Sequence, residues 1–125
     1  MTENEISYKV RGAIYNVYNN LGPVLLESVY VSALRYELLN ESLNVKVEVP
    51  VPVYYGDEKL EIGFRLDLLV ENKVIIEVKS VENIAEVHHK QVLTYLKLTN
   101  LKLGILVNFN VEDINKGIFR KVNGL

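Results

Sequence analysis

A segment rich in valine, isoleucine and leucine, which is predicted to form a hairpin, carries the charged residues Asp67, Glu77 and Lys79. Two carboxylates that meet in a fold suit a hard divalent cation such as magnesium. A lysine beside them can hold a water nucleophile or neutralise charge on a phosphate. Each residue alone is ordinary, because a Glu-x-Lys on a strand is usually a solvated face. Their conjunction within one hairpin favours a cation-dependent site.

The register of this hairpin decides whether the two carboxylates meet. A three-residue loop at 71–73 places Asp67 opposite Glu77. The same register places Arg65 opposite Lys79. The remaining residues then form a wholly apolar face that should meet the core: Leu66, Leu68, Val70, Val74, Ile76 and Val78. A two-residue loop would mix both sets on both faces, so the pattern favours the three-residue loop.

Hydrophobic periodicity predicts the elements on both sides of the hairpin. Prolines in the first strand indicate an edge or a bend. A helix between the third and fourth strands favours a mixed sheet and an α/β fold. The expected order is helices over about 4–20 and 23–40, strands over 45–53, 59–70 and 74–81, a helix over 85–99, and strands over 102–109 and 117–122.

The second of these helices carries an unexpected carboxylate. Leu38, Leu34 and Val31 form one apolar stripe, and a further turn back along this stripe leads to Glu27. A charged residue at the head of an inward stripe is expected to have a partner. Glu27 is therefore a third candidate for the site of Asp67 and Glu77, and three crowded carboxylates should raise the pKa of at least one of them.

Composition restricts the classes of protein that remain. Hydrophobic residues make up 49% of the 125 positions and charged residues 24%, which fits one globular domain over residues 1–125. The absence of cysteine excludes disulfide scaffolds and thiol chemistry. A net charge of −2 argues against a broad basic surface for nucleic acid. No apolar run approaches the roughly 18 residues of a membrane span, and the acidic start is unlike a signal peptide, so we expect a cytoplasmic protein without membrane contact.

Two motifs resemble those of a known superfamily. Asp67 followed by Glu77-Val78-Lys79 resembles the motif of the PD-(D/E)XK nuclease superfamily, and Gln91 with Tyr95 resembles the QxxxY motif of its RecB-like branch. More narrowly, the chain resembles the small GxxExxY family. The matching segments are 21–23, 26–30, 64–70, 76–79, 88–97 and 103–109. Two positions depart from the pattern, because Val24 replaces the name-giving glycine and Leu66 replaces the proline of the PD pair.

The resemblance implies a restriction-endonuclease-like fold, with an α-β-β-β-α-β core, a mixed four- to five-stranded sheet flanked by helices and an extra N-terminal helix. It also implies a metal-dependent nuclease acting on nucleic acid, with DNA preferred. Asp67 and Glu77 would be the core ligands of magnesium or manganese, and Glu27 would complete or orient the metal shell. Lys79 would orient the attacking water, and Gln91 would position the substrate or a water.

Further residues are weaker candidates for substrate contacts. Tyr95 lies one helical turn after Gln91, and His88 lies three residues before Gln91, so all three share a helix face. His89 points elsewhere and is expected to be solvated. The other two candidates are Arg65, for a phosphate, and Tyr30, for which core packing is an equal alternative.

Two other classes of function remain open. A nuclease-fold module that no longer cuts would act in nucleic-acid binding or protein assembly, but the complete charged set argues against it. A purely structural domain leaves the opposed carboxylates unexplained. The small size and an exposed sheet edge make homodimer formation an open alternative to a monomer.

Overall fold

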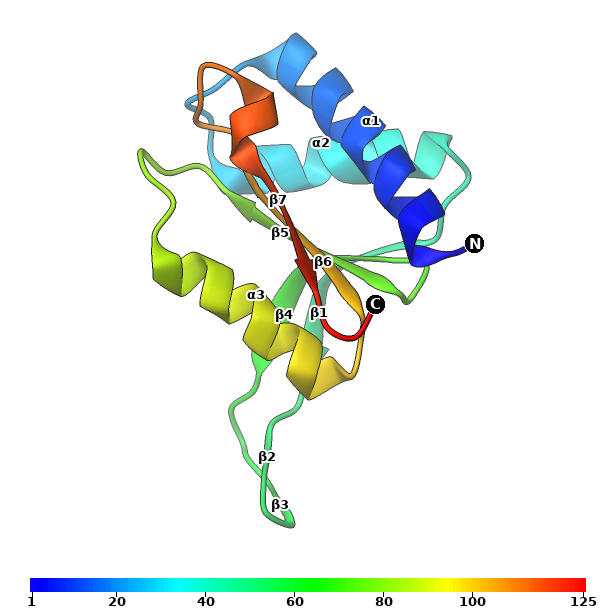
Figure 1. Cartoon of the computed structure of the whole chain (residues 1–125), viewed down its shortest axis with the longest axis vertical. Coiled ribbons are helices and arrows are strands. Elements are labelled where there is room, and N and C mark those ends of the chain that lie inside the picture. Colours follow the sequence, from blue (N-terminus) through cyan, green and yellow to red (C-terminus); the bar gives the residue numbers. More distant parts are fainter.

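Helices cover both faces of a mixed sheet in the computed structural model, which describes residues 1–125 (Figure 1). The α/β order expected from the sequence is confirmed. The elements are α1 (Glu3–Leu21), α2 (Glu27–Asn40), β1 (Val45–Val51), β2 (Tyr54–Tyr55), β3 (Glu58–Lys59), β4 (Phe64–Val70), β5 (Val74–Lys79), α3 (Glu86–Thr99), β6 (Leu103–Asn108), the 3₁₀ helix η1 (Ile114–Gly117) and β7 (Ile118–Val122).

The five-stranded sheet has the order β1-β4-β5-β6-β7. The pairs β1/β4, β4/β5 and β6/β7 are antiparallel, whereas β5 and β6 are parallel. The parallel pair requires a crossover connection, and α3 supplies it. This is the α/β restriction-endonuclease-like arrangement that the motif order predicts.

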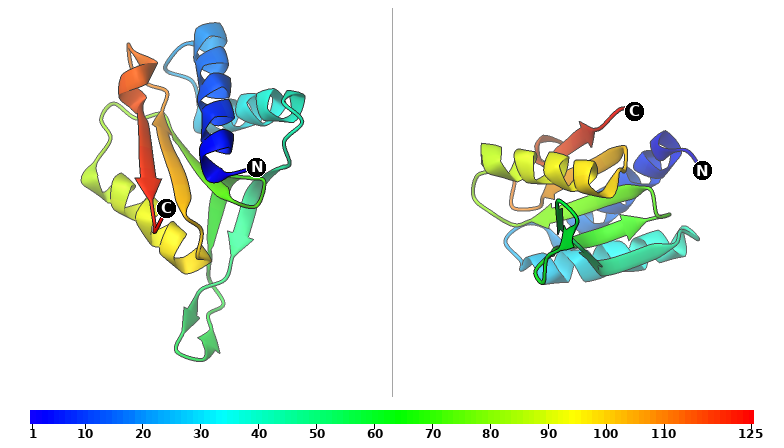
Figure 2. Two further views of the ribbon diagram at one scale, coloured as in Figure 1. Left: turned by 45° about the vertical axis from the view of Figure 1, so that its right-hand side comes forward. Right: turned by 90° about the horizontal axis from the view of Figure 1, so that it is seen from below.

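Two apolar clusters lie on opposite faces of the sheet. The larger cluster packs α1 and α2 on one face, and the smaller cluster packs α3 on the other. In the end-on view of Figure 2, α2 and α3 lie on opposite sides of the sheet. The helical stripe read from the sequence in α1 is confirmed, because its members are all buried: Ile6, Val10, Ala13, Ile14 and Val17. No helix of the chain is both long and apolar enough to span a bilayer.

The hairpin of β4 and β5 has the expected register over its inner half. Val70 pairs with Val74 and Leu68 with Ile76, so the three-residue loop is confirmed. The residues predicted to form the apolar face of the hairpin do share one face, with one exception. Leu66 packs in the cluster under α3, whereas Leu68 packs in the cluster under α1 and α2.

The error at Leu66 arises from an interruption in the pairing of β1, β4 and β5 near Asp67. β4 stays paired with β1 on both sides of Asp67, but its pairing with β5 stops at Leu68. In β1, Glu48 lies between the residues that pair with Leu66 and Leu68, and it has a φ of 50°. A positive φ at this point interrupts the pleat, so the period of two fails across it.

The segments at two element boundaries differ from the sequence-based expectation. Pro23 does not begin α2, because residues 22–26 form a loop and the helix starts at Glu27. Residues expected to belong to one strand over 59–70 divide into β3 and β4. β2 and β3 form a separate ribbon that projects from the body of the molecule (Figure 1).

Gly104 sets the close approach of α3 to the sheet. A Cβ atom at this position of β6 would lie 2.6 Å from Val92 Cγ1 of α3. Glycine therefore lets the helix pack closely against the strand. This packing determines where the polar face of α3 lies relative to β5.

Candidate active site

The site lies at the fork where β4 leaves β5. The regular ladder ends at Leu68 and Ile76, and the two carboxylates continue the connection in place of backbone pairs. The Asp67 N–H donates to Glu77 Oε1 at 3.1 Å, and the Val78 N–H donates to Asp67 Oδ2 at 2.8 Å. Asp67 and Glu77 are thus brought together, as the register predicted.

Each carboxylate keeps one oxygen without a backbone donor. Asp67 Oδ1 and Glu77 Oε2 accept no backbone N–H, and the two side chains hydrogen-bond to each other while Glu77 is protonated. Neither oxygen is buried, because the single buried side-chain atom without a partner is His89 Nδ1. Two solvent-reaching carboxylate oxygens on adjacent strands are the donor type that a hard divalent cation prefers.

Glu77 is strongly perturbed at this position. Its side chain is only 4% exposed. Burial, followed by the nearby charge of Asp67, raises the pKa of Glu77 from 4.5 to about 9. The expectation that carboxylate crowding raises the pKa of at least one of these groups is therefore confirmed for Glu77.

Lys79 is the cation of this site. Val78 packs into the cluster under α1 and α2, so its neighbours Glu77 and Lys79 both point to the opposite face. The Lys79 charge acts to lower the pKa of Glu77, but its ammonium forms no ion pair within 4.0 Å. Lys79 is half-buried and its charge is available to a ligand.

Helix α3 places Tyr95 over the two carboxylates. The ring of Tyr95 stacks on Phe64 of β4 with a centroid distance of 4.2 Å. Burial and then the charges of Glu77 and Asp67 raise the pKa of the Tyr95 hydroxyl, whereas the side chain of Gln91 acts in the opposite direction. Tyr95 therefore lies near the two carboxylates with the side chain of Gln91 beside it, and its ring also packs the helix on the sheet.

Glu27 reaches the end of β5 rather than the two carboxylates. It is the first residue of α2 and is exposed, so it does not lie on the inward stripe that the sequence predicted. The buried stripe is instead Tyr30, Leu34 and Leu38. The Ser80 N–H donates to Glu27 Oε2 at 3.0 Å. Glu27 is thus held by Ser80, the residue that follows Lys79 in the sequence.

The expected shell of three carboxylates is not formed. Nowhere in the chain do three or more histidine, cysteine or carboxylate side chains form one metal-binding group. Asp67 and Glu77 meet directly, whereas Glu27 is held by the backbone of Ser80. The residues present thus fit a cation held by two carboxylates, with the remaining coordination positions open.

A family model described as PD-(D/E)XK nuclease superfamily matches residues 4–121. The chain belongs to this superfamily. No curated protein matches the chain significantly. Membership in the PD-(D/E)XK nuclease superfamily supports a nuclease-type function, and it agrees with the positions of the superfamily motif, Asp67, Glu77 and Lys79, at the fork.

Tyr30 is a packing residue in this PD-(D/E)XK chain and not a substrate contact. It is 0% exposed and its ring stacks on Phe109 at 4.2 Å. Its hydroxyl donates to the Gly22 carbonyl at 2.6 Å and accepts the Leu25 N–H at 3.2 Å. A side chain without exposed surface cannot touch a substrate, so the core-packing alternative is correct.

Arg65 does not face Lys79, contrary to the sequence-based register. Its neighbours Phe64 and Leu66 both point into the cluster under α3, so Arg65 points to the other face. There it pairs with Glu48 at 3.5 Å, and both side chains are well exposed. The cause is the fork, because β4 has already left β5 at this position.

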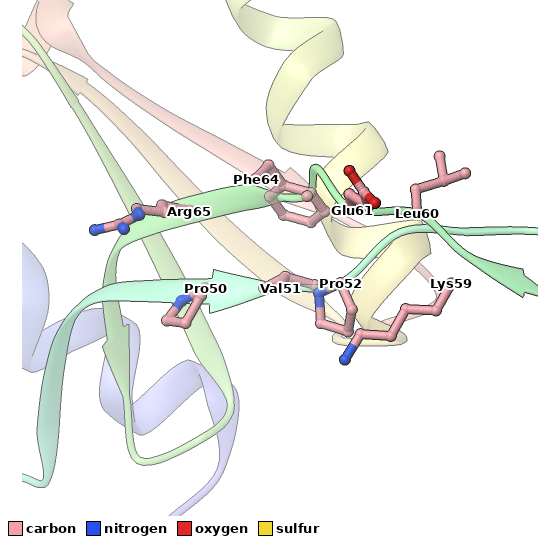
Figure 3. Close-up of a pocket in the computed structure, with 9 residues that line it drawn as sticks. Pro50, Val51, Pro52, Lys59, Leu60, Glu61, Phe64 and Arg65 are labelled. Atoms are coloured by element: carbon pink, nitrogen blue, oxygen red, sulfur yellow. The ribbon is translucent and has the colours of Figure 1, made fainter.

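Arg65 instead borders an open cavity at the base of the β2–β3 ribbon. The cavity has a volume of about 480 Å³ and lies between the end of β1 and residues 59–65 (Figure 3). Neither Asp67 nor Glu77 lines it. The largest hollow near the ribbon is therefore separate from the PD-(D/E)XK carboxylates.

The two histidines have structural environments. His88 Nδ1 accepts the Ala85 N–H at 3.0 Å and so closes the first turn of α3. His89 is half-buried rather than solvated, because its ring packs edge-on against Phe119 at 4.8 Å. Burial and then the charge of Lys121 lower the pKa of His89.

Sequence analysis missed two polar residues beside the PD-(D/E)XK site. Ser80 follows Lys79 and contacts the segment that carries Glu27. Asn108 ends the apolar strand β6, where it is only 2% exposed, and hydrogen-bonds to the backbone of Val81. An amide at the end of a wholly buried strand was a signal that could have identified Asn108.

Proposed function

We propose that this chain is a metal-dependent nuclease that hydrolyses phosphodiester bonds, with DNA as substrate and magnesium or manganese as cofactor. The observation that carries the proposal is the meeting of Asp67 and Glu77 at the fork, each with one oxygen that accepts no backbone hydrogen bond. Placing the buried Glu77 against the charge of Asp67 costs free energy unless a cation compensates the pair. A bound cation would offset this cost, which is why the pair supports a cation-binding role.

The residues divide the chemistry between them. Asp67 and Glu77 would hold the ion through the oxygens that accept no backbone hydrogen bond. A bound divalent cation would lower the pKa of a coordinated water and stabilise charge on the phosphorus centre. Lys79 carries its charge on the same face and would orient the attacking water or neutralise the phosphate. Glu27, at the end of β5, would orient a water rather than bind the ion itself.

Helix α3 would position the substrate. Tyr95 lies near the two carboxylates and contacts Gln91, whose amide would donate to a phosphate oxygen or to a water. Tyr95 is held by its stack on Phe64, so its hydroxyl has a defined place. His88, with Nδ1 engaged as an acceptor, has its Nε2 atom left to donate to a substrate.

We also propose the finer classification as a member of the GxxExxY family in the RecB-like branch. The Gln91–Tyr95 pair at the site and the Glu27–Tyr30 segment beside it support this placement. Val24, which replaces the glycine of that motif, has a φ of 70°. This backbone conformation suits glycine, so a glycine at this position, as in the motif, would be accommodated without strain.

A cleavage panel tests the function. Plasmid DNA, single- and double-stranded oligonucleotides and RNA are incubated with the full chain and magnesium or manganese. We expect DNA cleavage by the wild type and loss of more than about a hundredfold in Asp67→Asn, Glu77→Gln and Lys79→Met, because each removes a group that acts on the transition state. Gln91→Ala should be milder, since positioning contributes less than charge.

Matched controls distinguish the site from general surface charge. Glu48→Gln removes an exposed carboxylate of the neighbouring strand, and Lys97→Met removes an exposed lysine of α3. Both variants should cut like the wild type. Binding of manganese should be lost in the two carboxylate variants and kept in Lys79→Met. A wild-type protein that binds neither ion and cuts no nucleic acid would overturn the enzyme proposal in favour of a non-cutting module.

A further inference from the structure

The loop that delivers Glu27 is strained. Residues 22–26 join α1 to α2, and within them Gly22 has a φ of 68° and Val24 a φ of 70°. A β-branched residue in the left-handed region is a conformational outlier, whereas glycine adopts it freely. Such strain persists only where the surroundings hold the backbone in place. The contacts that hold this loop therefore determine where the Glu27 carboxylate lies.

Two side chains hold the loop from opposite sides. From within the core, the Tyr30 hydroxyl bonds the Gly22 carbonyl and the Leu25 N–H. From the end of β5, Ser80 Oγ donates to the Leu25 carbonyl at 2.6 Å. The Ser80 N–H also donates to Glu27 Oε2 at 3.0 Å. Ser80 thus contacts both the loop backbone and the carboxylate.

Asn108 fixes the segment that carries Ser80. It lies beside Lys79 in the parallel pair of β5 and β6. Its Oδ1 accepts the Val81 N–H at 3.1 Å, and its Nδ2 donates to the Val81 carbonyl at 2.9 Å. Oδ1 also accepts the Asn110 N–H at 3.2 Å. A buried amide with such paired contacts immobilises the residue after Ser80.

We propose that Ser80 and Asn108 are positioning residues that hold the Glu27 carboxylate at the active end of β5. The proposal deepens the proposed nuclease function and rests on it. Asn108 fixes Val81, the fixed chain presents the N–H and hydroxyl of Ser80, and Ser80 anchors Glu27 and its loop. Neither residue touches the reacting atoms, so each acts through Glu27. The cavity of about 570 Å³ beside Glu27 and Ser80 leaves room for water or substrate at this carboxylate.

The series of contacts from Asn108 through Ser80 to Glu27 is called the relay below. Steady-state cleavage of a DNA oligonucleotide by the full chain with magnesium tests it. Ser80→Ala keeps the N–H and removes the hydroxyl. We expect kcat to fall about fivefold or more with KM within about twofold, because the hydrogen bond that anchors the loop carrying Glu27 is lost. Ser80→Thr should restore kcat. Asn108→Asp, which keeps size and acceptors but loses the donor to Val81, should lower kcat in the same way.

Double variants decide whether the effect passes through Glu27. In a Glu27→Gln background, Ser80→Ala should cost less than about twofold, since residues that act as one unit are not additive. The matched controls are Ser7→Ala, which removes a buried serine of α1, and Asn123→Ala, which removes an amide bound to two backbone carbonyls near the end of α3. Equal losses in both backgrounds, or equal losses in the controls, would overturn the proposal.

A readout without catalysis separates this proposal from the function itself. If the wild type cuts no nucleic acid with either cation, the nuclease proposal fails, and hydrogen exchange of the Ser80 amide then judges the relay. The Asn44 amide, which donates to the Glu71 carboxylate at 2.7 Å, serves as internal reference. Faster exchange at Ser80 but not at Asn44 in Glu27→Ala and Asn108→Asp supports the positioning. Unchanged exchange at Ser80 in either variant contradicts it.

Discussion

Asp67 and Glu77 replace backbone hydrogen bonds with side-chain ones. Each carboxylate accepts an N–H from the opposite strand and keeps its second oxygen free of backbone hydrogen bonds. The two groups therefore connect the strands at the fork of the sheet, where we propose that they also bind a cation. Their cost appears in the raised pKa of Glu77, which burial and the neighbouring charge keep protonated well above its usual range.

This shift predicts a pH-dependent stability of the metal-free protein. Between pH 4.5 and about 9 the folded chain binds a proton at Glu77 that the unfolded chain has released. The contribution of Glu77 to the free energy of unfolding is thus fully present below pH 4.5. It is lost as the pH rises through the pKa of about 9 in the folded chain. Glu77→Gln should not show this loss. The difference in the free energy of unfolding between this variant and the wild type should therefore grow in favour of the variant, by at most about 1.4 kcal/mol per pH unit.

Urea unfolding of both proteins at several pH values, with a chelator present, measures this difference. The Gln side chain keeps an acceptor for the Asp67 N–H, so the comparison isolates the charge. Glu82→Gln, at an exposed position, is the control and should follow the wild type. A constant difference between Glu77→Gln and wild type from pH 5 to 9 would refute the prediction.

At the scale of elements, three segments shape the fork and the adjacent end of β5. The interrupted pairing of β4 opens the fork, α3 places Tyr95 near the two carboxylates with Gln91 beside it, and the strained loop before α2 brings Glu27 to the end of β5. The distance between α3 and the sheet depends on Gly104, which faces Val92 closely. Packing in the smaller cluster and the geometry of the site are therefore coupled.

Gly104→Ala should disturb both the packing of the smaller cluster and the geometry of the candidate site. The added methyl group would clash with Val92, which is buried and β-branched, so α3 must shift away from β6. We expect a loss of about 1–3 kcal/mol in the free energy of unfolding. We also expect a lower kcat, because Gln91 moves with the helix.

Double substitution provides the check. Gly104→Ala with Val92→Ala restores space and should recover kcat more than stability, since it leaves a smaller apolar contact. Gly12→Ala, which adds a methyl group to α1 where no atom lies within 4 Å, is the control and should keep activity. An unchanged kcat in Gly104→Ala would show that the position of α3 does not affect the reaction.

At the scale of the whole molecule, the net charge of −2 and the carboxylates at the fork both oppose a polyanionic substrate. A bound cation would reverse the local sign at the site. Cation binding to the folded chain would also stabilise it against unfolding, because the unfolded chain does not bring Asp67 and Glu77 together.

Manganese should therefore raise the melting temperature of the wild type. At an ion concentration of about one hundred times Kd, the gain in the free energy of unfolding is about 2.7 kcal/mol. Differential scanning calorimetry with and without manganese measures it. The shift should vanish in Asp67→Asn and persist in Lys79→Met. A shift of equal size in Asp67→Asn would place the ion elsewhere on the chain.

The local patterns in the sequence were enough to predict the elements and half of the site. Period-two alternation and a three-residue loop set the pairing of Val70 with Val74, and this pairing brings Asp67 to Glu77. Helical spacing likewise placed Gln91 and Tyr95 on one face. These predictions succeeded because they depend on contacts between near neighbours, which backbone geometry alone dictates.

Tertiary structure decided the remainder. The interrupted pairing at Asp67 moved Leu66 and Arg65 to other faces, and no local period reveals where one strand leaves another. Burial of Tyr30 and the capture of Glu27 by Ser80 join segments that are far apart in sequence. Such contacts depend on how whole elements pack, because each side chain takes the partner that the assembled sheet and helices bring to it.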